Sequence, residues 1–186
     1  MSVLSHLLLL LERQRWGVIF VSLVLLPLLL PEPIDEPVAR RVVRELFRPV
    51  QPGRYTPRAC GQWHFLPDSE ALLEALSHEL SAYAGAELLG ANHVSLPVCL
   101  LAWRGAVLVN PRIVVEYAKP RMHETRTPRL CAAGASPVLM PLSDSFEIEW
   151  RLADASVQRK RVKGAEALHL HRALRILEGH AVCGLG

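Results

Sequence analysis

The stretch Val107-Leu108-Val109-Asn110-Pro111-Arg112-Ile113 places a β-rich run, an Asn-Pro pair and the start of a second β-rich run in direct succession. Apolar and β-branched residues favour strands, so the pattern predicts one strand over 106–109 and another over 113–117. A further strand is predicted over 94–101, with a turn at Arg104-Gly105 between it and the next strand. These short strands, close together in the chain, indicate a sheet at its centre.

Helical periodicity flanks this strand-rich centre. The spacing of apolar residues predicts an amphipathic helix over 38–47, a helix between Ser69 and Gly85, and a C-terminal helix over 164–177. The alternation over 146–152 predicts a strand, and the polar, basic segment 155–163 is interpreted as a loop. This order of helices and strands predicts an α+β fold.

The first 37 residues differ in composition from the rest of the chain. Leu7 to Leu11 is an unbroken leucine run, and no charge appears from Trp16 to Leu30. The uncharged stretch is shorter than the ~20 apolar residues that a membrane-spanning helix needs, and Pro27 interrupts it. We therefore interpret 1–37 as an apolar extension with a Pro-rich linker, which buries its surface on a partner or in a membrane. Residues 38–186 are expected to form one globular domain.

Four cysteines stand far apart among 186 residues, at Cys60, Cys99, Cys131 and Cys183. No C-x-x-C motif occurs, which excludes a zinc ribbon and a thioredoxin-like motif. Wide spacing in a chain of this size favours reduced thiols, and the alternative is a secreted protein with two disulfides.

Arginine supplies most of the positive charge, because 18 of the 21 basic residues are Arg and three are Lys. Arginine makes bidentate contacts to phosphate, so the excess fits a partner rich in phosphate, although coding bias in a GC-rich genome explains it equally well. The candidate RNA contacts form two groups: Arg40, Arg41, Arg44 and Arg48 on the first helix, and Arg159, Lys160, Arg161 and Lys163 in the basic segment.

Four segments carry a further pattern. They are Leu88-Leu89-Gly90-Ala91-Asn92-His93-Val94, the stretch 107–113, Arg129-Leu130-Cys131 and His171-Arg172-Ala173-Leu174-Arg175. In order and spacing they match the phrases G-L-A-A-x-Q, L-I-N-P, E-G-C-L-S and H-E-x-D-H of the peptide deformylase family. The chain resembles that family over residues 40–180, which implies the peptide deformylase fold with a motif helix near the C-terminus.

The resemblance implies a site that has lost its chemistry. In the family, one cysteine and two histidines hold a divalent metal, whose bound water attacks the formyl carbon, and a glutamate relays protons. Cys131 and His171 match two of the metal ligands, whereas Arg175 takes the place of the third and Arg172 that of the glutamate. Arginine cannot become a ligand, and two ligands hold a catalytic metal poorly. We therefore expect no catalytic residue, no metal and no cofactor.

A rescued metal site is the alternative. His93 takes the place of the family's glutamine, so Cys131, His171 and His93 are the residues that would hold a metal in a diverged hydrolase. Otherwise Cys131 is a small buried side chain and His171 a hydrogen-bonded core residue. The vestigial pocket would then consist of Cys131, His171, Arg172, Arg175, His93 and Gly90.

These observations predict a non-catalytic, deformylase-like protein that serves as a structural or binding subunit of a large assembly. Deformylases act on nascent chains at the ribosome of bacteria and organelles. The resemblance therefore implies the mitochondrial ribosome or its assembly machinery, with ribosomal RNA as a partner. The alternatives are the metal-dependent hydrolase and a membrane-anchored accessory subunit of an organellar complex, which depends on the apolar stretch 16–30.

Overall fold

An antiparallel five-stranded sheet with the strand order β1-β2-β3-β6-β7 forms the centre of the fold. It is seen in a computed structural model that describes residues 36–65, 69–127 and 129–184. The strands are β1 (Leu89–Gly90), β2 (Leu100–Trp103), β3 (Ala106–Glu116), β6 (Ser145–Arg151) and β7 (Val157–Lys163). A separate two-stranded sheet pairs β4 (Arg121–Thr125) with β5 (Val138–Leu142).

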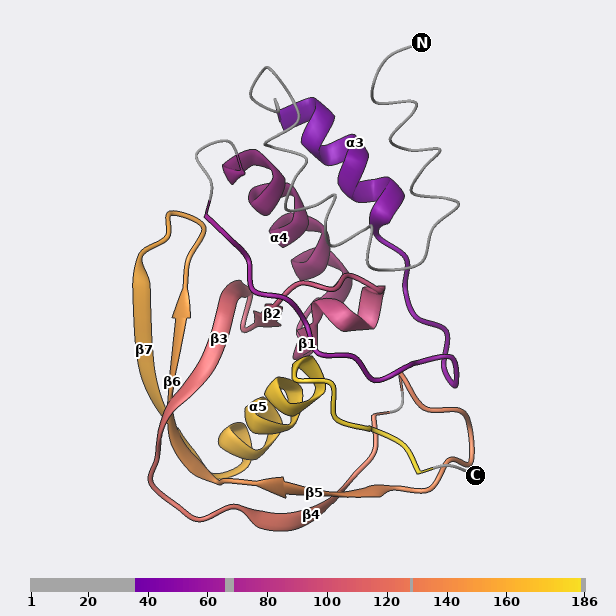
Figure 1. Ribbon diagram of the computed structural model, residues 1–186, viewed down its shortest axis with the longest axis vertical. Coiled ribbons are helices and arrows are strands. Elements are labelled where there is room, and N and C mark those ends of the chain that lie inside the picture. Colours follow the sequence, from indigo (N-terminus) through magenta and orange to yellow (C-terminus); the bar gives the residue numbers. More distant parts are fainter. Residues whose placement is uncertain (1–35, 66–68, 128, 185–186) are drawn as a thin grey trace.

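Three helices cover this framework in the described part of the chain (Figure 1). They are α3 (Glu36–Leu46), α4 (Glu70–Ala84) and α5 (Gly164–Leu177). Figure 1 shows α3 and α4 together at one end of the molecule and α5 within the curve of the strands. One buried cluster joins α3, α4 and β2, and a second joins α5 to the inner face of β6 and β7. The predicted α+β fold is confirmed.

The three predicted helices are found almost as expected. Pro37, which was placed in the linker, instead belongs to the first turn of α3. Proline suits that position because the first helical N–H groups have no intrahelical acceptor. Residues 1–35, the rest of the predicted extension, lie outside the described residues. No described helix is long and apolar enough to cross a membrane.

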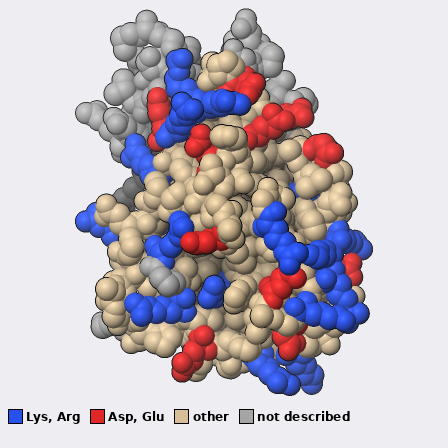
Figure 2. Space-filling model, turned by 180° about the vertical axis from the view of Figure 1, so that it is seen from behind, with Lys and Arg blue, Asp and Glu red and all other residues tan. Residues whose placement is uncertain are grey.

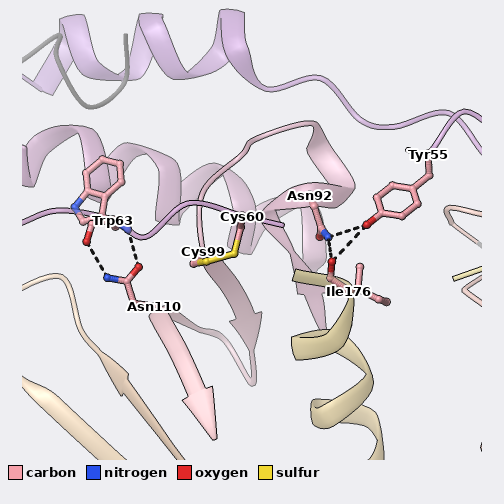
Figure 3. The surroundings of a disulfide bond; sticks show 7 residues. All are labelled: Tyr55, Cys60, Trp63, Asn92, Cys99, Asn110 and Ile176. Atoms are coloured by element: carbon pink, nitrogen blue, oxygen red, sulfur yellow. Dashed lines mark hydrogen bonds between the residues drawn. A yellow bond between two sulfur atoms is a disulfide. The ribbon is translucent and has the colours of Figure 1, made fainter. Parts of the chain in front are cut away.

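The stretch 107–113 forms the middle of one long strand, β3, where two shorter strands were predicted. The register with β6 shifts between Val109 and Arg112, because Pro111 has no N–H to donate to the ladder. Asn110 takes a left-handed φ of 50° at this bulge. Its side chain accepts from Trp63 N at 2.7 Å and donates to Trp63 O at 2.8 Å, as Figure 3 shows. The side chain of Asn110 thus attaches the segment around Trp63 to the sheet.

Two predicted elements are wrong. The strand expected over 94–101 begins only at Leu100, and Ala91–Val94 forms a short 3-10 helix, η1. Ser95 follows it with a left-handed φ of 61°, which interrupts any extended run. The basic segment expected to be a loop contains the edge strand β7, paired with β6 along its whole length. Charged residues are common on such edges because they discourage pairing with another chain.

The four cysteines form two disulfides, so the prediction of reduced thiols is wrong. Cys60–Cys99 has a Cα–Cα separation of 5.1 Å, and Cys131–Cys183 has one of 5.7 Å. Distance along the sequence carries no information about which cysteines meet in space. The first bridge ties the segment before α4 to the residue before β2, and the second ties the C-terminal tail to the segment between β4 and β5.

We predict that the denatured, unreduced protein has no reactive thiol and that reduction exposes four. Replacing Cys60 and Cys99 together by Ser should lower the free energy of unfolding by about 2–4 kcal/mol, because the open chain gains entropy when a long loop is released. Thiol titration and urea denaturation measure the two effects. Four reactive thiols before reduction would show that neither bridge is present.

Candidate functional site

His171 lies in the core on the inner face of α5, with 4% of its surface exposed. Ser143 N donates to His171 Nδ1 at 2.8 Å, and the imidazole meets the Phe146 ring edge-to-face with the centroids 5.4 Å apart. Burial lowers the pKa of this histidine, so the neutral form is favoured. Because Nδ1 accepts a backbone N–H, only Nε2 remains for any other partner. Its surroundings are those of a hydrogen-bonded core residue.

Cys131 is buried and bonded to Cys183, so its sulfur offers no thiolate to a metal. It packs in a cluster with Leu130, Ile176 and Val182. Val50 and Tyr55 lie against the same cluster from the segment that follows α3. The position that resembles a metal ligand is therefore part of a small apolar core.

His93 lies on η1 and is 3% exposed. Its Nδ1 is 3.1 Å from Gly90 O, so this nitrogen donates when it carries the hydrogen. Burial lowers the pKa of His93 to about 4, and the positive charges of Arg129 and Arg172 lower it further, against the opposing effect of the Gly90 hydrogen bond. At neutral pH His93 is an uncharged imidazole.

Two arginines on α5 stand where the resemblance implies a glutamate and a metal ligand. Arg175 Nη1 lies 2.9 Å from Glu178 Oε2, in an ion pair within the last turn. Arg172 is half-buried, and burial lowers its pKa. Its side chain makes neither a hydrogen bond nor an ion pair with another described residue. Both side chains keep a positive charge at neutral pH, which opposes the binding of a metal cation nearby.

The donor set does not fit a divalent metal. The charges that act on His93 are those of Arg129, Arg172 and Glu87, whereas Glu116, Arg175 and Glu178 act on His171. The two histidines thus have different charged neighbours. Within residues 36–65, 69–127 and 129–184, no group of three His, Cys, Asp or Glu side chains is placed to hold a metal ion. The alternative site of Cys131, His171 and His93 is not assembled in this structure.

The segment 50–55 crosses the place where the motif segments meet. Val50 N donates to His93 O and Gly53 N donates to Leu130 O, both at 2.9 Å. Tyr55 OH accepts from Asn92 Nδ2 at 3.2 Å, beside the end of α5 (Figure 3). No function was predicted for this segment, although Gln51-Pro52-Gly53-Arg54 has the turn signature of Pro followed by Gly.

The first group of RNA candidates lies on α3 or just beyond it. Arg41 is exposed, and Arg48 follows the last helical residue, so it was wrongly placed on the helix. The other two pair with carboxylates: Arg40 with Glu36, 2.5 Å apart, and Arg44 with Glu79, 3.7 Å apart. This group therefore keeps fewer unpaired cations than the sequence suggests.

The second group is divided between two faces of the sheet by the strand geometry of β7. Successive side chains on a strand point to opposite faces, so Arg159, Arg161 and Lys163 share one face. Lys160 points to the other, where its Nζ lies 4.7 Å from the centroid of the Trp103 ring. The structure therefore brings together three of the four predicted residues.

Comparison with solved structures identifies the fold. A peptide deformylase from the Vibrio parahaemolyticus bacteriophage VP16T has a TM-score of 0.55 and 14% identity, covering 71% of this chain and 97% of that one. A class I type b peptide deformylase from Acinetobacter baumannii has a TM-score of 0.54 and 11% identity, with 74% and 97% covered. The plant peptide deformylase PDF1B has a TM-score of 0.52 and 20% identity, with 73% and 78% covered.

The chain thus has the peptide deformylase fold, as the resemblance implied. No protein-family model and no curated protein sequence matches it. At 11–20% identity, the similarity to these structures is one of fold.

We predict a pH-dependent contribution of His93 to stability. Its folded pKa of about 4 lies below the unfolded value of 6.5. Its contribution is therefore fully present above pH 6.5 and is lost as the pH falls toward 4, by about 3 kcal/mol in total. In urea denaturation across this range, His93→Gln should lose less stability than the wild type. His169→Gln, which changes an exposed histidine of α5, is the control, and equal losses in wild type and His93→Gln would contradict the assignment.

Proposed function

We propose that this chain is a non-catalytic protein of the peptide deformylase fold that serves as a structural or binding subunit of a large assembly. The observation that carries the proposal is the state of three motif positions. Cys131 is bonded to Cys183, Arg172 is a half-buried cation, and Arg175 is ion-paired to Glu178. None of these groups supplies a metal ligand or a proton acceptor at neutral pH.

The outer face of the sheet, which is the side of β3, β6 and β7 that faces away from α5, is the surface that best fits an anionic partner. Figure 2 shows Lys and Arg side chains gathered on the side of the molecule that these strands form. The strand register places five cations and two carboxylates on this face: Arg112, Arg151, Arg159, Arg161, Lys163, Glu147 and Glu149. The excess of positive charge favours contact with phosphate.

The cations of the outer face fall into two classes. Arg112 and Arg159 both hydrogen-bond to Glu149, and these bonds hold the pKa of its carboxyl below the usual value. The second class makes no ion pair with a described residue: Arg151, Arg161 and Lys163. Within this class, Arg161 lies over the Tyr117 ring, with 4.0 Å between its Cζ and the ring centroid. These three remain available for phosphate, which positions a partner without reading sequence.

The partner that we propose for this face is ribosomal RNA, and the assembly is the mitochondrial ribosome or its assembly machinery. Two observations support this: the arginine excess of the chain and the fold it shares with deformylases. The two disulfides favour a second candidate, because such bonds persist in oxidising compartments. That candidate is an accessory subunit of an organellar membrane complex, exposed to an oxidising compartment.

We predict that replacing Arg151, Arg161 and Lys163 together by Gln weakens association with RNA. Each lost phosphate contact should flatten the slope of log affinity against log salt by about 0.7 to 0.9, so three should flatten it by about two. The measurement is a pull-down of the full chain from cells across a salt series, with RNA and proteins both identified.

A matched triple variant outside β3, β6 and β7 is the control: Lys119→Gln, Arg121→Gln and Arg126→Gln, all exposed near β4. It should keep the wild-type slope. A wild-type pull-down that contains membrane-complex subunits and no RNA would replace the ribosomal proposal by the second candidate. Equal losses in both triple variants would show that the outer face has no particular role.

A further inference from the structure

A groove of about 870 Å³ is lined by residues that lie outside β3, β6 and β7. The segment 48–61 forms one wall, and η1 with the residues up to Pro97 forms the other. Its volume falls within the range of small-molecule sites, roughly 300–1,000 Å³. The proposed function gives this groove no role.

The two walls of the groove are joined by covalent and backbone bonds. Cys60 lines the groove and is bonded to Cys99, as Figure 3 shows. Cys60 N donates to Leu177 O and Gly61 N to Pro97 O, each at 2.8 Å, and Cys99 N donates to Gly61 O at 2.9 Å. The groove is therefore built before any ligand arrives, which limits the entropy lost on binding.

The outer wall is fixed by a tight turn. Arg54 N donates to Gln51 O at 3.0 Å, and Gly53 has a φ of 82°, which a turn with Pro52 before it requires. A Cβ at Gly53 would lie 3.0 Å from Ala132 Cβ, so the turn is seated closely against the next segment. This turn places Arg54 at the groove, and Arg48 lines it from just before the turn.

The charge of the groove has one sign. Arg48, Arg54 and Arg58 line it, and no Asp or Glu is among its described lining residues. Arg48 and Arg54 make no ion pair with another described residue. Cations that line one hollow without a carboxylate give it a positive potential, which attracts an anion. Guanidinium groups match the oxygens of phosphate with paired hydrogen bonds.

We propose that this groove binds a phosphorylated small molecule, with Arg48 and Arg54 holding the phosphate. Apolar lining residues such as Leu96 and Pro97 would accommodate the body of the ligand. The RNA backbone carries the same phosphate chemistry, but a continuous polymer is better served by the broad outer face of the sheet. The inference stands independently of the proposed function, because a structural subunit and a working enzyme can each carry such a site.

The test is calorimetric titration of the full chain with inorganic pyrophosphate at constant ionic strength. The wild type should bind saturably, and Arg48→Gln with Arg54→Gln should weaken the affinity at least tenfold. Lys119→Gln with Arg121→Gln removes two exposed cations that do not line the groove and should leave the affinity unchanged. Arg54→Glu alone, which reverses one charge at an exposed position, should also abolish binding.

No saturable binding by the wild type, or equal affinity in the wild type and the Arg48/Arg54 double variant, would overturn the proposal. A short single-stranded oligoribonucleotide separates the two sources of phosphate. It should fail to displace pyrophosphate. Displacement of pyrophosphate from the wild type by the oligoribonucleotide would assign the groove to RNA and overturn the small-molecule assignment. Because the substituted residues are exposed, unchanged thermal unfolding of each variant checks that the fold is intact.

Discussion

The end of α5 is the constraint on which the rest of the structure depends. The last carbonyls of a helix have no partner within it and must find donors elsewhere. Here Ile176 O accepts from Asn92 Nδ2 and Leu177 O accepts from Cys60 N, each at 2.8 Å. These two bonds bring the segment before α4 and the 3-10 helix η1 onto one helix end. Leu177 also fills the space beside Gly90, where a Cβ would lie 2.8 Å from Leu177 Cδ2.

This junction holds the fold together through packing and hydrogen bonds. A metal-dependent hydrolase needs donors that converge on an open position for water. The corresponding region here is closed by packing: Ile176, Cys131 and Val182 form an apolar cluster, and the bridge to Cys183 locks it. Arg172 and Arg175 add positive charge on the same helix.

Sequence reasoning predicted the elements whose pattern is local. The helix at 164–177 was found because buried Leu170 and Leu174 recur at helical spacing. The sequence-based prediction failed where the structure of a segment depends on residues far away in the chain. The charges of β7 suggested a loop, but its ladder with β6 makes it a strand. The bond between Cys131 and Cys183 joins residues 52 positions apart, and no spacing rule predicts such a pair. The sequence gives the positions of Arg172 and Arg175, but the partners of their side chains depend on the folded chain.

Turnover of a formyl-methionyl peptide tests the central claim most directly. The full chain would be incubated with iron, nickel or zinc, both oxidised and after reduction of its disulfides, and released formate would be measured together with bound metal. We predict no formate above the buffer rate and no stoichiometric metal in either state, because Arg172 and Arg175 remain when the Cys131 thiol is freed. Metal-dependent turnover that His171→Ala abolishes would contradict it, since the site would then be a working one.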